Sequence, residues 1–334
     1  MKHFEFWHPR LFEAPYYAYL LGRCALKGFD PRNLPKADYA LDHGELGLGS
    51  KYSTQMMFDQ ERFPTTELLD CPQQVTSTPS TGFPAILKPD IGAVGKGINK
   101  VESLDGLNGL TGRLHGRFIL QSFCADPEEF GIFYIRKAGI QRISGINRKH
   151  FPTVVGNGRD TVATLARNHQ RYTNHWGLFL KYLDTQRVPA DGEQVRLSFV
   201  GSHTMGCRFT NDTALLTPAL ERAVFKLCST QPGFNFGRLD VKSRSVDALR
   251  QGQFTVIEIN GIASLPTHMF DPDNTIRDAY QIFLEHGRHL VDIAHEQRNR
   301  DMQIDTVSEI WRRARDNHER LNALHQQAIQ SEAS

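Results

Sequence analysis

The sequence lacks the features that mark several classes of protein. It has five cysteines, an odd number, and no C-x-x-C pair, which argues against a disulfide framework or a zinc site and predicts free, reduced thiols. No apolar run reaches the roughly 18 residues of a membrane span. The N-terminus also lacks the uninterrupted apolar stretch of a secretory signal. We therefore expect a soluble, cytoplasmic protein without a membrane partner.

An excess of charge of one sign is absent as well. The chain has 39 Lys and Arg residues against 37 Asp and Glu residues, which gives a formal net charge of +2. Attraction to a phosphate backbone needs a basic excess, so we expect no nucleic-acid partner. The 334 residues, 40% of them hydrophobic, are enough for a substantial core in two or three domains.

Changes in pattern divide the chain into three parts. Residues 77–82 are polar and rich in turn formers, and we place a boundary after residue 80. Residues 1–80 have few convincing strands and form a reduced N-terminal region, whereas residues 81–300 intersperse strands with helices. Residues 301–334 form a C-terminal helix. This alternation predicts an α+β protein with substantial sheet.

Periodicity and turn signals give the expected elements. Strands are expected at 83–88, 117–123, 130–136, 141–146, 195–208, 237–241 and 254–259, and the third and fourth of these form a hairpin turned at 137–139. Helices are expected at 15–26, 51–63, 161–182, 275–296 and 306–329. The last helix starts at a capping box, Thr306-x-x-Glu309. The apolar face of this helix consists of Val307, Ile310, Trp311, Leu321 and Leu324. Such a face indicates a helix that packs against the rest of the chain or forms a dimer contact, so a homodimer remains open.

Lys88 is followed at once by a glycine-rich segment. Gly92, Gly95 and Gly97 would let backbone N–H groups approach an anion closely, and Lys96 adds a second cation. The spacing is not that of a Walker A loop, because Gly97 and not Ser or Thr follows Lys96. A loop that covers phosphates beside Lys88 and a plain hairpin turn are both open readings.

Two late strands carry polar side chains among aliphatic neighbours. Asp240 lies in one of them, and Glu258 and Asn260 lie two residues apart at the end of the other, so this pair faces one side of the sheet. Three oxygen donors suit a hard cation such as Mg²⁺ held together with nucleotide phosphates. The alternative is a solvent-facing acidic edge of the sheet.

Taken in order, these motifs resemble the ATP-grasp superfamily over roughly residues 80–300. The order is Lys88 with its glycine loop, Gln121-Ser122-Phe123 followed by Glu128-Glu129, then Gly237-Arg238-x-Asp240, and last Glu258-x-Asn260. The final part is most similar to the D-alanine–D-alanine ligase branch, and residues 147–162 resemble a segment of cyanophycin-synthetase-like members. The resemblance implies an ATP-grasp fold, in which two α+β subdomains grip ATP.

The resemblance also implies a role for each motif residue. The phosphates of ATP would be held by Lys88, Gly92, Gly95, Lys96 and Gly97. The hinge whose backbone contacts adenine would consist of Gln121, Ser122 and Phe123. Glu129 would hold the ribose, with Glu128 as its rival. One or two Mg²⁺ ions, or Mn²⁺, would be bound by Asp240, Glu258 and Asn260. Arg238 would stabilise the oxyanion during attack on the acyl centre, with a structural ion pair as the alternative.

Further cations are less clearly assigned. Arg148 and Lys149 could face the γ-phosphate or an anionic substrate, or belong to a solvated turn before a helix. Arg208, at a strand end, could bind phosphate or a substrate carboxylate. Lys51 is the only reasonable candidate for a second phosphate lysine upstream of the loop, although its context favours a surface lysine. Residues 261–268 lack the N-T-x-P-G-x-T sequence of D-alanine ligases, which argues against D-alanine as substrate.

The resemblance implies an ATP-dependent carboxylate–amine ligase, an ADP-forming enzyme that makes an acyl phosphate. Its partners would be a small-molecule or peptide carboxylate and an amine nucleophile. Two alternatives remain open: a phosphotransferase that acts as a small-molecule kinase, and a catalytically silent nucleotide-binding partner protein.

Overall fold

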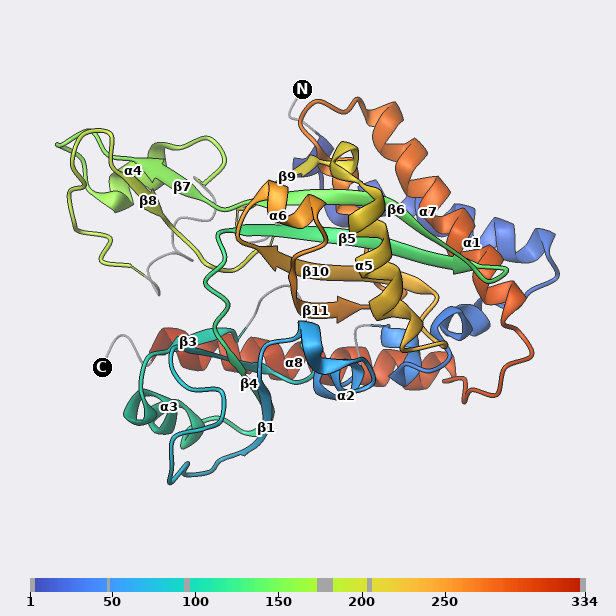
Figure 1. Cartoon of the computed structure of the whole chain (residues 1–334), viewed down its shortest axis with the longest axis horizontal. Helices are drawn as coiled ribbons and strands as arrows, with labels where there is room; N and C mark the ends of the chain where they lie inside the picture. Colours follow the sequence, from blue (N-terminus) through green and yellow to red (C-terminus); the bar gives the residue numbers. More distant parts are fainter. Residues whose placement is uncertain (1–3, 47–48, 93–96, 173–182, 203–205, 331–334) are drawn as a thin grey trace.

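The computed structural model describes residues 4–46, 49–92, 97–172, 183–202 and 206–330, and these form the α+β fold that the sequence predicts (Figure 1). Two antiparallel sheets dominate it, and a third, two-stranded sheet lies in a small lobe. The lobe consists of α4 (Val162–Asn168), β7 (Thr153–Val155) and β8 (Gln194–Arg196), and it packs around a core of its own.

The smaller of the two main sheets has four strands in the order β1-β4-β2-β3. The strands are β1 (Thr66–Cys71), β2 (Ala85–Pro89), β3 (Asn99–Val101) and β4 (Gly116–Ser122). Leu87 and Leu120 pack against Leu107 of α3 (Leu104–Thr111), so one face of the sheet is covered by this helix. The sheet that carries Lys88 thus takes in β1, which lies before the predicted boundary at residue 80.

The larger sheet has five strands in the order β11-β10-β5-β6-β9. The strands are β5 (Glu128–Lys137), β6 (Ile140–His150), β9 (Arg208–Asn211), β10 (Phe236–Ser243) and β11 (Thr255–Asn260). The hairpin of β5 and β6 confirms the sequence prediction, and its turn uses Ala138 and Gly139 at positive φ. On one face, Ile132 and Leu239 pack against α5 (Pro218–Ser229), beside which lies α6 (Val246–Arg250) (Figure 1).

The other face of the large sheet changes character along β10. Side chains two residues apart share a face of a strand, so Phe236, Arg238, Asp240 and Lys242 all lie on this side. Phe236 belongs to an apolar core shared with α1 (Pro9–Leu26) and α7 (Ile276–Glu296). The three charged residues continue from this core into a cavity.

The N-terminal region is helical and closes over α7. The aromatic ring of Tyr16 in α1 stacks on that of Phe283 in α7, with ring centroids 3.9 Å apart. The shorter elements of this region are η1 (Phe4–Phe6), η2 (Pro31–Asp38), η3 (Asp42–Glu45), α2 (Lys51–Met56) and η4 (Gln60–Arg62). Two further short helices in the described part of the chain are η7 (Thr213–Leu215) and η8 (Thr267–Phe270).

Three predicted elements have different bounds in the structure. The helix expected at 15–26 begins at Pro9, because the side chain of His8 caps it and Pro15 is accommodated inside it. The helix expected at 51–63 ends at Met56, since the side-chain amide of Gln60 donates to backbone carbonyls at residues 55 and 58. The strand expected at 195–208 is divided between β8 and β9.

The helix expected at 161–182 also differs. It ends at Asn168, after which the ring of Tyr172 stacks on His169 and its hydroxyl accepts a hydrogen bond from the backbone N–H of Thr153. These contacts turn the chain back onto β7. The second half of the predicted helix, residues 173–182, lies outside the described residues.

The C-terminal helix α8 (Val307–Gln330) confirms both the predicted element and its capping box, in which Thr306 and Glu309 bond to one another's backbone N–H groups. Val307 and Trp311 of the predicted apolar face are 56% and 73% exposed. The side chains of Leu321 and Leu324 lie outside the described residues, and the homodimer stays a prediction.

Asp38 links the N-terminal region to β10. Its fully buried carboxylate accepts hydrogen bonds from the backbone N–H groups of Asn235 and Phe236, at 2.7 and 2.9 Å, and the side-chain amide of Asn235 donates to Ala37 O at 2.7 Å. This link fixes the start of the strand that carries Arg238.

We predict that Asp38→Ala lowers the free energy of unfolding by about 2 to 4 kcal/mol, because it leaves two buried N–H groups without an acceptor. Asp38→Asn keeps an acceptor oxygen and should lose less than half as much. Urea denaturation followed by circular dichroism measures both, and an alanine variant as stable as the wild type would contradict the prediction.

Candidate functional site

A cavity of about 520 Å³ lies between the two main sheets and reaches the N-terminal helices. Most of the residues that the sequence singles out line it, although they come from separate parts of the chain. They are Lys88, Gly92, Gln121, Ser122, Phe123, Glu129, Lys149, Arg238, Asp240, Glu258 and Asn260.

The acidic wall of the cavity is set by the pairing of β10 with β11. In this register Asp240 lies opposite Glu258, and Arg238 lies opposite Asn260. The four side chains therefore share one face of two adjacent strands, as period two along each strand predicts. Two carboxylates placed directly opposite one another repel, so the arrangement needs cations between or beside them.

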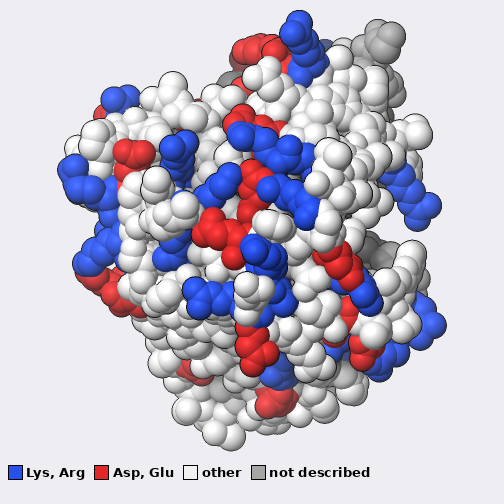
Figure 2. Space-filling model, turned by 90° about the vertical axis from the view of Figure 1, so that its right-hand side faces the viewer, with Lys and Arg blue, Asp and Glu red and all other residues white. Residues whose placement is uncertain are grey.

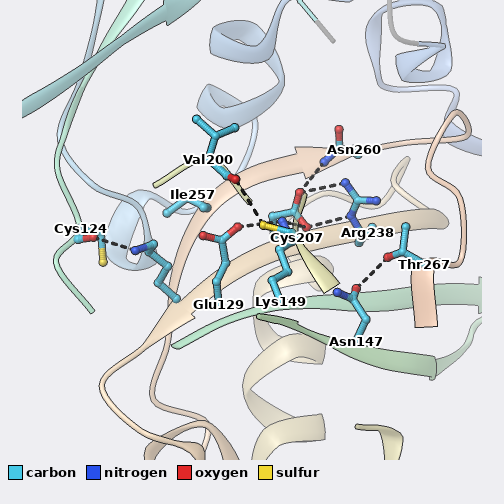
Figure 3. Close-up of polar contacts among 12 residues, drawn as sticks. Cys124, Glu129, Asn147, Lys149, Val200, Cys207, Arg238, Ile257, Asn260 and Thr267 are labelled. Carbon is cyan, nitrogen blue, oxygen red and sulfur yellow. Dashed lines mark hydrogen bonds and ion pairs between the residues drawn. The ribbon is translucent and has the colours of Figure 1, made fainter. Parts of the chain in front are cut away.

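Three polar partners surround the carboxylate of Asp240. Arg238 holds it with two hydrogen bonds of 2.8 and 2.9 Å, Lys149 Nζ lies 3.2 Å from Oδ1, and Asn260 Nδ2 donates to Oδ2 at 3.3 Å (Figure 3). Lys149 also donates to Glu129 at 2.8 Å. Burial alone would lower the pKa of Lys149, but the carboxylates of Asp240 and Glu129 outweigh it and raise that pKa. Lys149 is therefore charged and held within the cavity.

Lys51 neutralises the other carboxylate. Its Nζ lies 2.5 Å from Oε1 of Glu258, and both side chains are mostly buried. Burial raises the pKa of Glu258, but Lys51 and then Lys88 outweigh that effect and lower the pKa below its usual range. The sequence reading that favours Lys51 as a surface lysine is therefore wrong.

The position of Lys51 depends on a contact distant in sequence. Asp90, buried directly after β2, accepts hydrogen bonds from the Ser50 hydroxyl at 2.8 Å and the Tyr52 backbone N–H at 3.0 Å. Ser50 in turn caps α2 by accepting from Ser53 N–H. This anchoring directs the first residue of α2 into the cavity, which no local pattern indicates.

Lys88 extends from the small sheet to the large one. Its Nζ donates to Gln121 Oε1 at 3.1 Å on the neighbouring strand and to the carbonyl of Ile257 on β11 at 3.2 Å. Burial lowers the pKa of Lys88, and the charge of Glu258 offsets part of this effect. A cation held by neutral oxygens at the junction of two sheets is well placed to meet an anion.

The predicted hinge forms the junction between β4 and β5. The backbone N–H groups of Ser122 and Phe123 donate to Thr65 O and Pro84 O, at 2.9 and 3.1 Å. Lys242 Nζ donates to the carbonyls of Cys124 and Asp126, which follow the hinge. Figure 3 draws the bond to the Cys124 carbonyl.

Lys242 lines the cavity, and the sequence analysis did not predict it as a site residue. The signal that could have found it is the period of two along β10, since Lys242 follows Asp240 by two residues on the same face of the strand.

The two rival glutamates are the first two residues of β5 and point to opposite sides of the sheet. Glu129 lines the cavity and pairs with Lys149, whereas Glu128 forms a two-pronged contact with Arg148 at 2.8 and 2.9 Å outside the lining. Of the two, Glu129 is the one positioned to meet a ligand in the cavity. Its assignment to ribose stays a prediction.

Some predicted residues are not brought into the site. Arg208 is exposed on the edge strand β9, and Arg208 and Gly97 are both outside the cavity lining. Gly95 and Lys96 lie outside the described residues. The roles assigned to these four stay predictions.

The oxygen donors fit a hard cation. Asp240, Glu258 and Asn260 offer two carboxylates and an amide on one face, which is the chemistry that Mg²⁺ prefers, and the lysines beside them show that this face attracts positive charge. Among the described residues, no group of three or more His, Cys, Asp or Glu side chains is arranged as a metal site. A cation here would accordingly depend on further oxygens from a ligand.

The charge of the exterior is mixed. Lys and Arg side chains are interspersed with Asp and Glu over the face shown in Figure 2. In the described part of the chain, no helix combines the length and the hydropathy that a membrane span needs.

Comparisons with solved structures give matches of low sequence identity. A bifunctional glutathione synthetase from Pasteurella multocida is 13% identical over 70% of this chain and 36% of that chain, with a TM-score of 0.38. A D-alanine–D-alanine ligase from Bacillus anthracis complexed with ATP is 14% identical over 77% of this chain and 67% of that one, with a TM-score of 0.42. The corresponding ligase from Helicobacter pylori is 16% identical over 71% and 60%, with a TM-score of 0.34.

Two of these three solved structures are D-alanine–D-alanine ligases. The chain spans only about a third of the length of the glutathione synthetase. No family model and no curated relative match the chain.

Glu45 is a further buried acid of the cavity. Its side chain is 3% exposed, and one of its carboxylate oxygens has no hydrogen-bond partner. Burial raises the pKa of Glu45 from 4.5 to about 7, although Lys51 offsets part of this effect.

The raised pKa predicts a dependence of stability on pH. The folded protein holds a proton on Glu45 that the unfolded chain releases, so stability falls as the pH rises from the unfolded pKa through the folded one. Between pH 5 and 8 we expect the free energy of unfolding of the wild type to fall by up to about 3 kcal/mol relative to Glu45→Gln. Urea titrations in EDTA at several pH values measure this difference, and parallel profiles for the two proteins would refute it.

Proposed function

We propose that the protein is a Mg-ATP-dependent ligase that activates a carboxylate as an acyl phosphate and joins it to an amine. The observation that carries this proposal is the meeting of two opposed sets of charges in one cavity. Lys51 and Lys88 enter it beside the small sheet, and Asp240 and Glu258 face them from the large sheet. Phosphates need the first set, and a phosphate-bound cation needs the second.

The ion pairs of the cavity can exchange partners when a nucleotide binds. Lys51 would leave Glu258 for a phosphate oxygen, and Glu258 would then accept a cation in place of the lysine. The base would lie against Phe123, and the ribose hydroxyls would be within the reach of Glu129. Mg²⁺ held by Asp240, Glu258 and Asn260 would supply neutralisation of the phosphate charge.

The reaction then has two steps, both next to the γ-phosphate. In the first, a carboxylate oxygen takes the γ-phosphoryl group, which gives an acyl phosphate and ADP. In the second, the amine nitrogen attacks the acyl carbon, the bond from carbon to the phosphate oxygen breaks, phosphate leaves with the electron pair, and the amine loses a proton to solvent. Arg238 would stabilise the negative oxygen of this second step.

The nucleotide site is tested by removing one lysine at a time. We expect Lys51→Met and Lys88→Met each to weaken Mg-ATP binding by about tenfold to a hundredfold, because each removes a charge-assisted hydrogen bond to phosphate. Lys226→Met, at a lysine whose side chain is 73% exposed on α5, is the matched control and should bind as the wild type does. Isothermal titration measures the affinities, and unchanged binding in both cavity variants would overturn the phosphate assignment.

The reaction class is tested by a screen for ADP release over pairs of carboxylates and amines. A ligase releases ADP and free phosphate only when both substrates are supplied. Phosphate that remains on a single acceptor would identify a phosphotransferase instead. Tight Mg-ATP binding with no turnover for any pair would favour the silent nucleotide-binding protein.

A further inference from the structure

Beside Arg238 the cavity has a second wall, made by η1, α1 and the segment after β11. Arg238 and the side chain of Asn147 both pack over Gly131, where an added Cβ would lie 2.9 Å from the arginine Cδ and 2.2 Å from the amide Oδ1. The same Asn147 oxygen accepts from the hydroxyl of Thr267 at 3.0 Å, and Thr267 begins η8, which ends at Phe270. The second wall is therefore continuous with the site of acyl chemistry.

Aromatic side chains dominate this wall. Phe12 of α1 packs between Phe270 and Phe4, with ring centroids 5.4 and 5.7 Å away, and all three line the cavity together with Trp7 and Leu265. A surface of this kind binds apolar groups by burial and aromatic groups additionally by ring contacts.

The cations that line the cavity are confined to one part of it. All described lysines and arginines of the lining lie on α2, β2, β6 and β10, between Arg238 and the part of the cavity assigned to phosphates. They are Lys51, Lys88, Lys149, Arg238 and Lys242. The charged lining residues that come from η1 and α1 are Glu5 and Glu13. Glu5 is paired with Arg171 at 2.7 Å, and the half-buried Glu13 accepts from the Tyr17 hydroxyl. Arg171 thus neutralises Glu5 from outside the lining, and Glu13 leaves this wall with a carboxylate and no described lining cation to meet a carboxylate-bearing ligand.

We propose that this aromatic wall selects the amine substrate, and that the substrate is a primary amine with an aromatic or bulky aliphatic body and no carboxylate. The inference rests on the proposed function, because that function puts the phosphates on one side of Arg238 and this inference puts the amine on the other side. The apolar body lies against Phe12, Trp7 and Phe270. The nitrogen points back toward the acyl phosphate, where the new C–N bond replaces the bond to the phosphate oxygen.

The test measures the binding of three matched probes to the full chain saturated with Mg-ADP. Phenethylamine carries the ring, ethylamine lacks it, and phenylalanine adds a carboxylate. We expect phenethylamine to bind about tenfold to a hundredfold more tightly than ethylamine, and about tenfold more tightly than phenylalanine. Ethylamine or phenylalanine binding as tightly as phenethylamine would overturn the inference.

Variants assign the effect to the wall. Trp7→Ala should weaken phenethylamine binding about tenfold and leave ethylamine unchanged, and Trp7→Phe should restore most of the loss. Glu13→Gln should improve the binding of phenylalanine relative to phenethylamine. Leu11→Ala is the matched control, because Leu11 lies on α1 close to Trp7 in the sequence, is 73% exposed and is outside the lining, so it should change nothing. A response of Leu11→Ala equal to that of Trp7→Ala would contradict the assignment.

The same titrations separate the two proposals. If Mg-ADP and Mg-ATP fail to bind, the proposed function fails and the inference fails with it. If nucleotides bind normally and the three amines do not differ, only the inference about the amine is wrong.

Discussion

The opposition of Asp240 and Glu258 across β10 and β11 is the constraint on which the rest of the site depends. Like charges that face one another across a strand pair destabilise the sheet, so their neutralisation is a condition of folding. Arg238 and Lys149 neutralise the first carboxylate from within the large sheet, whereas Lys51 reaches the second from α2. The same electrostatic requirement therefore shapes the sheet and draws the N-terminal region against it.

Stability alone does not account for these buried pairs. Taking charges out of water costs free energy that the attraction within a pair only partly restores, and apolar residues of similar volume often serve a fold as well. A set of buried pairs around one cavity is better explained by exchange of partners. Under the proposed function, phosphates would take Lys51 and a cation would take Glu258, so the total charge would stay balanced in both arrangements. A preorganised site of this kind avoids rearrangement of solvent when charge moves during a reaction.

The sequence predicts the parts of the site that follow local rules. Period two on a strand places Arg238 with Asp240 and Glu258 with Asn260, and the hairpin of β5 and β6 follows from a turn flanked by apolar runs. Lys51 could not be found in this way, because Asp90, about 40 residues away in the chain, directs α2 into the cavity. The local sequence pattern determines the face of a strand or helix on which a side chain lies. Tertiary contacts determine which other parts of the chain that face packs against.

The aromatic wall shows how the described part of the N-terminal region completes the cavity. Phe12 contacts the rings of Phe4 and Phe270 beside the cavity and those of Tyr280 and Phe283 on α7, with centroids between 5.2 and 5.8 Å. One residue thus belongs both to the core that anchors α1 and to the surface that a substrate would touch. Because interiors are closely packed, α1 cannot shift without disturbing that core. The packing of α1 against α7 therefore holds this part of the wall in place.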